Sequence, residues 1–287
     1  MQNLGINNLD IYLTGKCNFA CRYCYGENEK NGSMNEHTFS KCIDFAKYIS
    51  CKNIEFCGGE PLVAREFEKY AVVARNNGFK VILRTNGMLI DKHLKFIAEN
   101  CDWVGISIDG LPHENAVMRL SRVQISEEEQ FLTPIKAICE LKNRNQELRI
   151  VLATVVSKKN YLKIQEFANY LIEKNIPINE WKIYEFIVDK FRSVENQKEF
   201  ELTEQEFLSA VSKLPKNING AKIIAKSAHS EKRAGDCLIV KQNGDIDNMG
   251  VHFGNVAVDD FDTIIDNLKK ADIIETIIQN KNETYSF

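Results

Sequence analysis

Short apolar runs alternate with longer amphipathic segments from the start of the chain to about Phe186. Apolar residues that recur every three or four positions are typical of helices, whereas short β-branched runs are typical of buried strands. The alternation therefore predicts repeated βα units around a parallel sheet. The predicted strands are Asp10–Leu13, Ile54–Cys57, Val81–Arg84, Val104–Ile108, Ile150–Val155 and Trp181–Phe186. The predicted helices are Glu36–Tyr48, Ala64–Asn76, Asp91–Ala98, Glu127–Lys142 and Leu162–Lys174.

Two helix starts carry capping residues. Ser126 is followed by three glutamates, and Thr203 is followed three positions later by Glu206. A hydroxyl at such a position accepts hydrogen bonds from the first free amides, and carboxylates favour the positive end of the helix dipole. We therefore predict a capping box at each place. Pro134 predicts a kink or a restart in the helix after Ser126, because proline lacks the backbone donor.

The pattern changes after Phe186. A polar stretch and a predicted helix over Thr203–Leu214 lead to a short apolar run, Cys237–Val240, and to a last helix that begins near Phe261. Six predicted strands are fewer than the eight of a closed (β/α)8 barrel. We therefore predict an α/β fold, with a partial (β/α)6 TIM-type barrel over residues 1–187. A small C-terminal α+β subdomain over residues 188–287 is expected to close the barrel.

Polar turns follow the predicted strands. In a parallel arrangement these turns meet on one rim, where the chemistry of such folds collects. The turns are Thr14-Gly15-Lys16, Gly58-Gly59-Glu60-Pro61, Thr85-Asn86-Gly87, Ser107 to Gly110 and Ser157 to Asn160.

Composition narrows the class of protein. Of the 287 residues, 44% are hydrophobic and 27% are charged, which excludes a disordered chain or a fibrous repeat. The net charge of −3 gives no overall attraction to a nucleic-acid polymer or an anionic membrane. No apolar run approaches the roughly 20 residues of a membrane span, and residues 1–8 lack the features of a signal peptide. We expect a soluble, cytoplasmic protein.

Three of the nine cysteines, Cys17, Cys21 and Cys24, lie together in the loop after the first predicted strand. Three thiolates can hold three irons of a [4Fe–4S] cluster and leave the fourth iron open for a small ligand. Structural zinc would need a fourth ligand, for which His37 is the early candidate. The scattered cysteines are expected to be small buried hydrophobic residues. They are Cys42, Cys51, Cys57, Cys101, Cys139 and Cys237.

The segment Cys-Asn-Phe-Ala-Cys-Arg-Tyr-Cys, residues 17–24, resembles the CxxxCxxC signature of the radical S-adenosylmethionine (radical SAM) superfamily. Three further motifs follow in order on consecutive strands. Gly58-Gly59-Glu60-Pro61 resembles the GGEP motif of the superfamily, residues 84–87 its TNG turn, and residues 107–110 its SxDG motif. The resemblance covers residues 9–187, and four ordered motifs are far more specific than one short pattern.

The resemblance implies a role for each motif. Cys17, Cys21 and Cys24 would ligate a [4Fe–4S] cluster whose open iron binds S-adenosyl-L-methionine (SAM). The residues implied to contact SAM are Tyr23 for the adenine, Gly58, Gly59 and Glu60 for the methionyl ammonium, Thr85 and Asn86 along the pocket, Ser107 and Asp109 for the ribose hydroxyls or the carboxylate, and Arg119 for the carboxylate. Alternatives stay open: Glu60 as a solvated residue of a glycine turn, Asp109 as a turn former and Arg119 as a solvated side chain.

The resemblance also implies an enzyme. The cluster would reduce SAM to methionine and a 5′-deoxyadenosyl radical, which abstracts hydrogen from the substrate, while the protein excludes water and oxygen. An electron donor such as flavodoxin or ferredoxin is the implied partner. Open cluster thiolates also imply oxygen sensitivity.

The substrate is less defined. The C-terminal third resembles viperin-like members in its segment order, and residues 237–256 resemble an auxiliary-cluster (SPASM/twitch-like) domain in which only Cys237 remains. We therefore expect no second cluster and a small-molecule or nucleotide substrate. The alternative is a ribosomally made peptide that is epimerised or cross-linked. Two further classes are a non-catalytic cluster-binding protein and a zinc or thiol redox protein.

Several residues are candidates for contact with the substrate. Tyr184 and Glu185 end the sixth predicted strand, and Cys237 is a hydrogen donor if it faces the site or a core residue if it does not. Basic and imidazole side chains are candidates for phosphate or substrate contact, with solvated side chains as the alternative. They are Lys158, Lys159, Lys182, Lys232, Arg233, His229 and His252.

Overall fold

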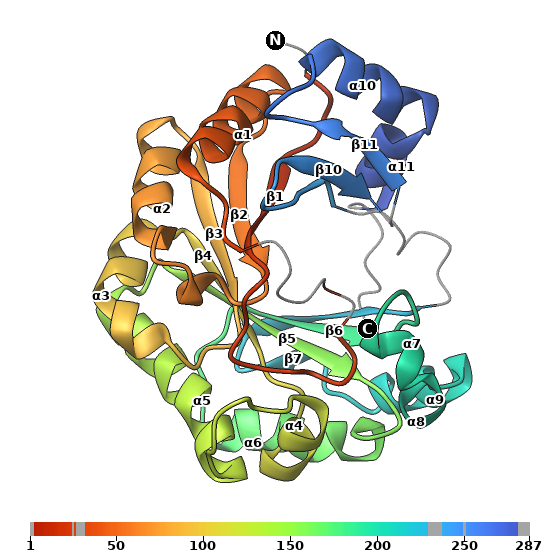
Figure 1. Cartoon of the computed structure of the whole chain (residues 1–287). Coiled ribbons are helices and arrows are strands. Elements are labelled where there is room, and N and C mark those ends of the chain that lie inside the picture. Colours follow the sequence, from red (N-terminus) through yellow and green to blue (C-terminus); the bar gives the residue numbers. More distant parts are fainter. Residues whose placement is uncertain (1–2, 25, 27–31, 229–236, 249–250, 281–287) are drawn as a thin grey trace.

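The fold is one curved sheet with helices on its outer face (Figure 1). The computed structural model describes residues 3–24, 26, 32–228, 237–248 and 251–280. Within these residues the strand order is β11-β10-β9-β1-β2-β3-β4-β5-β6-β8-β7. The strands are β1 (Asn8–Thr14), β2 (Asn53–Gly58), β3 (Lys80–Thr85), β4 (Trp103–Ser107), β5 (Arg149–Val156), β6 (Glu180–Glu185), β7 (Asn217–Ile218), β8 (Ala221–Lys226), β9 (Ile239–Val240), β10 (Asp245–Asn248) and β11 (Val251–Asn255).

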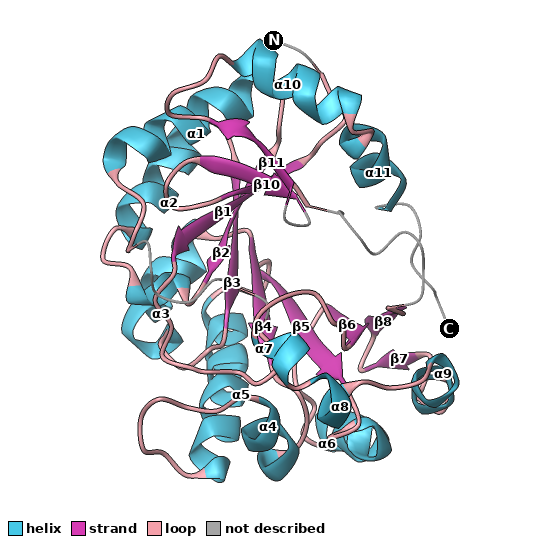
Figure 2. Cartoon of the chain, turned by 45° about the vertical axis from the view of Figure 1, so that its right-hand side comes forward, coloured by secondary structure: helices cyan, strands magenta, loops and turns pink. Residues whose placement is uncertain are grey.

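Helices α1 to α6 connect the consecutive parallel strands β1 to β6 or follow them, and the helices cover the sheet from outside (Figure 2). They are α1 (Glu36–Tyr48), α2 (Phe67–Asn76), α3 (Ile90–Asn100), α4 (Pro112–Met118), α5 (Glu127–Arg144), α6 (Ile164–Glu173), α7 (Arg192–Glu195), α8 (Gln197–Phe200), α9 (Glu204–Val211), α10 (Phe261–Lys270) and α11 (Ile273–Asn280), with two short 3₁₀ turns, η1 (Pro61–Val63) and η2 (Tyr161–Lys163). No described helix combines the length and the apolar character that crossing a bilayer requires.

The six predicted strands are confirmed as β1 to β6, which pair in parallel and in order. The sheet remains open, with β11 and β7 at its two ends among the described strands. The predicted partial α/β barrel is therefore confirmed, because successive parallel strands curve around one axis without closing.

One predicted helix start and one predicted helix interruption were wrong. The second helix begins at Phe67 and not at Ala64, because Ala64 has an extended backbone (ψ 125°) that ends η1. The fifth helix runs without a break from Glu127 to Arg144 with Pro134 inside it, so no restart occurs. The N-cap at Ser126 is confirmed by a 3.1 Å hydrogen bond from the Glu129 amide, and the capping box at Thr203 is complete.

The C-terminal third adds strands to both edges of the same sheet. β8 pairs in parallel with β6, and β9 pairs in parallel with β1. β10 and β11 form an antiparallel hairpin beyond β9. The division near residue 187 stays a prediction, although the strands after it hydrogen-bond directly to the strands before it.

Side chains alternate between the two faces of the sheet, as in any strand. On β1 the side chains of Leu9, Ile11 and Leu13 are fully buried toward the helices. Asp10 and Tyr12 alternate with them and lie on the inner, concave face, and Glu55 and Arg84 occupy the same face on β2 and β3. The inner face of the open barrel is therefore polar.

Candidate active site

The cysteine loop follows β1 at the carboxyl end of the parallel strands. A short β-bridge between Phe19 and Ser121 ties the loop to the segment after α4. The Ala20 amide donates to the Leu120 carbonyl at 2.7 Å, and the Arg122 amide donates to the Asn18 carbonyl at 2.9 Å. The loop that carries Cys17, Cys21 and Cys24 is thus anchored on both sides of Phe19.

The three thiols influence one another. Burial raises the pKa of Cys21 to about 12, the Arg119 guanidinium opposes this shift, and Cys24 and Cys17 add to it. Backbone amides donate to two of the sulfurs, from Phe19 to Cys17 and from Gly26 to Cys24, each at 3.4 Å. Hydrogen bonds to sulfur are typical of iron–sulfur sites.

The spacing of the thiols does not fit a single metal ion. No group of three or more His, Cys, Asp or Glu side chains in the described part of the chain is arranged to hold one ion. In a [4Fe–4S] cluster each cysteine binds a different iron, so the sulfurs lie farther apart than the ligands of one ion. The three cysteines of the loop match the number of protein ligands that a cluster with one open iron needs.

The turn after β2 packs against the start of the cysteine loop. The Gly59 amide donates to the Thr14 carbonyl and the Glu60 amide donates to the Lys16 carbonyl, both at 2.8 Å. A Cβ atom on Gly59 would lie 2.2 Å from the Lys16 carbonyl oxygen, and one on Gly58 would lie 2.7 Å from that of Thr14. The glycines are required here because backbone meets backbone.

Glu60 joins two turns of the rim. Its side chain is 1% exposed. One carboxylate oxygen accepts from the Thr85 hydroxyl at 2.7 Å and the Leu62 amide at 3.2 Å, and the other accepts from the Asn86 amide at 2.8 Å. The Asn86 side-chain amide in turn donates to Asn18 Oδ1 at 2.7 Å. A continuous set of hydrogen bonds therefore connects the turn after β2, the turn after β3 and the cysteine loop.

Replacing Glu60 by glutamine is expected to lower the free energy of unfolding by roughly 1–3 kcal/mol, because an NH2 group then meets donors that the carboxylate accepts. Urea unfolding of the metal-free protein measures the loss. The exposed Glu128→Gln on α5 is the matched control and should change stability by less than about 0.5 kcal/mol. A Glu60→Gln protein as stable as this control would contradict the bracing role.

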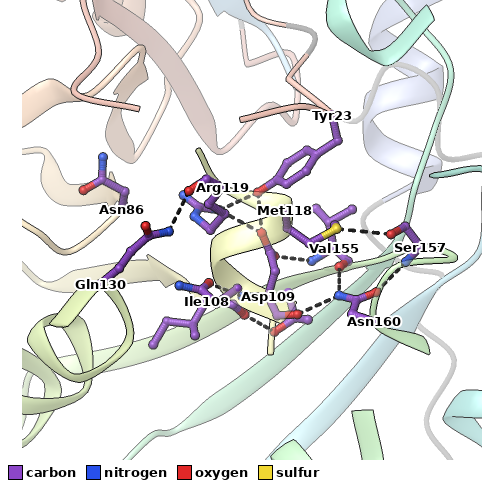
Figure 3. Close-up of polar contacts among 12 residues, drawn as sticks. Tyr23, Asn86, Ile108, Asp109, Met118, Arg119, Gln130, Val155, Ser157 and Asn160 are labelled. Carbon is purple, nitrogen blue, oxygen red and sulfur yellow. Dashed lines mark hydrogen bonds and ion pairs between the residues drawn. The ribbon is translucent and has the colours of Figure 1, made fainter. Parts of the chain in front are cut away.

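Asp109, Arg119 and Tyr23 form a second set of contacts across the rim (Figure 3). Arg119 donates through Nη1 to Asp109 Oδ2 at 3.1 Å and to the Tyr23 hydroxyl. The Tyr23 hydroxyl donates to the same carboxylate oxygen at 2.6 Å, and the Val155 amide donates to the other oxygen at 2.8 Å. The Asp109 and Arg119 side chains are 1% and 9% exposed, so the ion pair is buried.

Two buried side chains of this network were given no role by the sequence analysis, although Asn160 belongs to one of the predicted polar turns. Asn160 donates to the carbonyls of Asp109 and Val155 at 2.6 and 2.7 Å, and Gln130 donates to the Arg119 carbonyl at 2.6 Å (Figure 3). Their polar character after β5 and within α5 was visible in the sequence, but their partners lie far away along the chain. These hydrogen bonds fix the backbone carbonyls of Asp109 and Arg119, the two residues of the ion pair.

The remaining candidates fall in different places. Ser107 ends β4 and Tyr184 lies on β6, both on the inner face. Glu185 is 1% exposed and its carboxylate accepts from the Ser227 hydroxyl at 2.8 Å and the Ala228 amide at 2.7 Å. By strand alternation its side chain points away from the face that carries Tyr184.

The structure does not bring Cys237 to the cysteine loop. Its neighbour Leu238 accepts a hydrogen bond from the Asp10 amide, and Ile239 pairs with Asp10 in a parallel ladder. Cys237 therefore lies beside the amino end of β1, whereas the cysteine loop follows the carboxyl end. Of the scattered cysteines, Cys42, Cys51 and Cys101 are buried as predicted, and the others are half-buried.

The basic and imidazole candidates are also separated. Lys159 pairs with Glu199 at 3.0 Å, Lys158 is exposed, and His252 is exposed on β11. Lys182 lies on the inner face of β6 and is described below. His229, Lys232 and Arg233 lie outside the described residues.

Comparison with known families decides the identity. The sequence model of the Radical SAM superfamily matches residues 11–171, which is more than half of the chain. The chain belongs to the radical SAM superfamily. The resemblance found in the sequence is thereby confirmed, and so is an enzyme that uses a [4Fe–4S] cluster and SAM.

Individual relatives agree with this assignment. The Methanocaldococcus jannaschii protein MJ0907 is 28% identical over 84% of each chain. An S-adenosylmethionine-dependent nucleotide dehydratase of Selenomonas ruminantium is 27% identical over 61% of this chain and 64% of its own length, so less than two thirds of that enzyme is matched. The structure of anSMEcpe with bound AdoMet and the Kp18Cys peptide is similar with a TM-score of 0.75 and 17% identity, over 95% of this chain and 83% of that chain.

Proposed function

We propose that this radical SAM enzyme generates a 5′-deoxyadenosyl radical and uses it to abstract hydrogen from a small-molecule or nucleotide substrate. The observation that carries the proposal is the pair of polar networks that connect the cysteine loop to the other motifs. One runs from Asn18 through Asn86 to Glu60, and the other connects Tyr23 with Asp109 and Arg119. Motifs from four strands thereby share one rim.

Cys17, Cys21 and Cys24 would hold three irons of the cluster, and SAM would bind the fourth. When bound and reduced, this cluster supplies the electron that splits SAM into methionine and the radical. The protein's own groups then have to bind, orient and exclude water.

Residues of the rim would orient SAM. Glu60 uses three of about four acceptor positions on its carboxylate, which leaves one for the methionyl ammonium. Arg119 binds Asp109 and Tyr23 through Nη1, which leaves its other nitrogens for the methionyl carboxylate. The remaining residues assigned to SAM are Tyr23, Gly58, Gly59, Thr85, Asn86, Ser107 and Asp109.

A small-molecule or nucleotide substrate has the support of the Selenomonas ruminantium relative, which is named for action on a nucleotide. Peptide modification is the second candidate, and the anSMEcpe structure contains a bound peptide. At 17% identity that likeness concerns the fold alone. The reductant would be a flavodoxin or a ferredoxin. Of the proposed substrate-contacting residues, Tyr184 remains in this role because it lies on the inner face.

The test is anaerobic reconstitution with iron and sulfide, followed by dithionite and SAM, with 5′-deoxyadenosine measured by mass spectrometry. We expect the wild-type protein to form the nucleoside and the variant with Cys17, Cys21 and Cys24 replaced by alanine to form none above background. Cys139→Ala, a half-buried cysteine on α5 outside the loop, is the matched control and should keep the activity.

Either of two results would contradict the proposal. Wild-type protein that holds about four irons per chain but forms no 5′-deoxyadenosine would indicate a non-catalytic cluster-binding protein. Stoichiometric zinc in place of iron would indicate a zinc site. If the nucleoside forms, deuterium transfer from candidate substrates into it identifies the C–H bond that is attacked.

A further inference from the structure

Arg84 lies across the inner face of the sheet in an unusual position. It is the residue before Thr85 on β3, and it pairs with Gly105 on β4. A Cβ atom at Gly105 would lie 2.6 Å from both Cδ and Nη1 of Arg84, so the guanidinium group extends over the bare backbone of β4. Nε and Nη2 donate to the Glu55 carboxylate at 2.7 and 3.4 Å. These bonds use one edge of the guanidinium group, and Nη1 lies on the other edge above Gly105.

Lys182 shares this face. Its neighbours Trp181 and Ile183 are fully buried toward the helices, so Lys182 alternates to the inside. It pairs with Ala153 on β5, and Ser107 of β4 and Ala153 of β5 lie in the same row of the sheet. Burial lowers the pKa of Lys182, and the positive charges of Arg84 and Lys226 lower it further. Lys182 therefore lies close enough to Arg84 and to Lys226 to be repelled by both charges.

Buried carboxylates of the same face hold these cations. Glu180 serves two cations, with Arg149 at 2.5 Å and Lys182 at 3.4 Å. Glu55 serves Arg84. Asp10 pairs with Glu55 on the same face and adds a third buried negative group near Arg84. The cations of this face are therefore held by buried carboxylates.

The cationic side chains of this face are more exposed than the carboxylates. The side chains of Arg84 and Lys182 are 27% and 24% exposed, whereas those of Glu55 and Glu180 are 9% and 8% exposed. The negative groups lie beneath and the positive groups are accessible. The inner face of the open barrel therefore presents positive charge to whatever enters it.

We propose that Arg84 and Lys182 form an anchoring site for an anionic group of the substrate, a phosphate or a carboxylate, on the inner face of the barrel. The inference rests on the proposed function and deepens it, because it names the chemical class of the substrate. The placement fits this use, since Arg84 directly precedes Thr85 and Asn86, which contact Glu60 at the rim. The anchor lies one residue deeper on β3 than the proposed SAM residues, so SAM and substrate would contact neighbouring positions of one strand.

The chemistry of the two cations suits oxygen anions. A guanidinium nitrogen and an ammonium group both donate charge-assisted hydrogen bonds, and lysine binds phosphate as a point charge. Loss of one such bond is expected to weaken anion binding by roughly tenfold or more. Because Glu55 occupies Nε and Nη2, Arg84 can bind the anion only through its Nη1 edge. We therefore expect Lys182 to contribute more than Arg84 to the anion affinity.

The test is calorimetric titration of the cluster-reconstituted protein with pyrophosphate and, in a second arm, with succinate. Tighter binding of pyrophosphate assigns a phosphate-bearing substrate, and tighter binding of succinate assigns a carboxylate. We expect Lys182→Met to weaken the tighter probe at least tenfold and Lys182→Arg to retain binding. Gly105→Ala keeps every charge but displaces the Arg84 guanidinium group, so it should also weaken binding.

Lys80→Met is the matched control, because Lys80 is exposed at the opposite end of β3. This variant should bind the probe with the affinity of the wild type. Melting temperatures confirm that each variant is folded. The proposal is overturned if the wild type binds neither probe more tightly than about 1 mM, or if folded Lys182→Met binds as tightly as the wild type. The titration needs neither SAM nor reductant, so a failure of radical chemistry leaves it intact. If the wild type binds neither anion, its formation of 5′-deoxyadenosine can still be measured, so the two proposals fail independently.

Discussion

Replacing Asp109 by alanine is expected to lower the free energy of unfolding by roughly 3–5 kcal/mol, because Arg119 is then left as a buried charge without its carboxylate. Arg119 is 7% exposed and cannot turn to solvent without moving Tyr23, with which it also hydrogen-bonds. The Val155 amide loses its acceptor in the same change. Urea unfolding of the metal-free protein measures the effect without interference from the cluster.

A double-mutant cycle separates the ion pair from the loss of packing. Arg119→Leu removes the charge, and the double variant Asp109→Ala/Arg119→Leu should be less destabilised than the sum of the two single variants, because no charge is then buried alone. Asp266→Ala on the exposed face of α10 serves as the control and should change stability by less than about 0.5 kcal/mol. An Asp109→Ala protein within about 1 kcal/mol of the wild type would show that Arg119 finds solvent or another partner.

The parallel core was predictable because its signal is local. Each of β1 to β6 is a short apolar run between polar turns, and period-two alternation identifies its buried face without knowledge of its neighbours. The short elements were not predictable in this way. α4 spans only seven residues and begins at Pro112. β9 has only two residues, whose strand conformation depends on pairing with Asp10 and Ile11.

In the site, too, local features were predictable and long-range contacts were not. The cysteine spacing was readable because the three thiols come from one loop. The contact between Asp109 and Tyr23 could not be predicted, because the two residues are 86 positions apart. The same holds for the contact between Glu60 and Asn86, which are 26 positions apart. The sequence analysis assigned Asp109, Arg119 and Glu60 to SAM, with a turn former or a solvated side chain as the alternatives. The structure shows that each also binds other protein groups, which no single-chain pattern could reveal without the register of the sheet.

Cys237 illustrates the limit most clearly. Its chemistry made it a candidate hydrogen donor, and nothing in residues 237–240 tells which end of a parallel strand faces the site. The pairing of Ile239 with Asp10 places it at the amino end of β1. By contrast, the sequence placed Arg84 at the end of a predicted strand and named Lys182 as a candidate for phosphate contact, whereas their shared face and their buried counterions required the structure.

Replacing Gly59 by alanine is expected to abolish most of the cluster binding while leaving the barrel folded. The new methyl group would lie 2.2 Å from the Lys16 carbonyl oxygen and 2.7 Å from its carbon, and both atoms are backbone that cannot rotate away. Lys16 directly precedes Cys17, so relief of the clash moves the first thiol relative to Cys21 and Cys24. Three thiolates must reach three irons together, so a displaced Cys17 removes one ligand. Iron content after anaerobic reconstitution should fall at least several-fold, with loss of the visible absorption of the cluster.

Gly78→Ala provides the control for general destabilisation. Gly78 has φ +86°, so alanine there strains the backbone, but no atom lies within 4 Å of the new Cβ and the position is remote from the rim. This variant should lose some stability and keep its iron. Full iron content in Gly59→Ala would mean that the backbone of the cysteine loop yields at little cost, and the close packing of the two turns would then not determine cluster binding. Loss of iron in both variants would instead attribute the effect to stability alone.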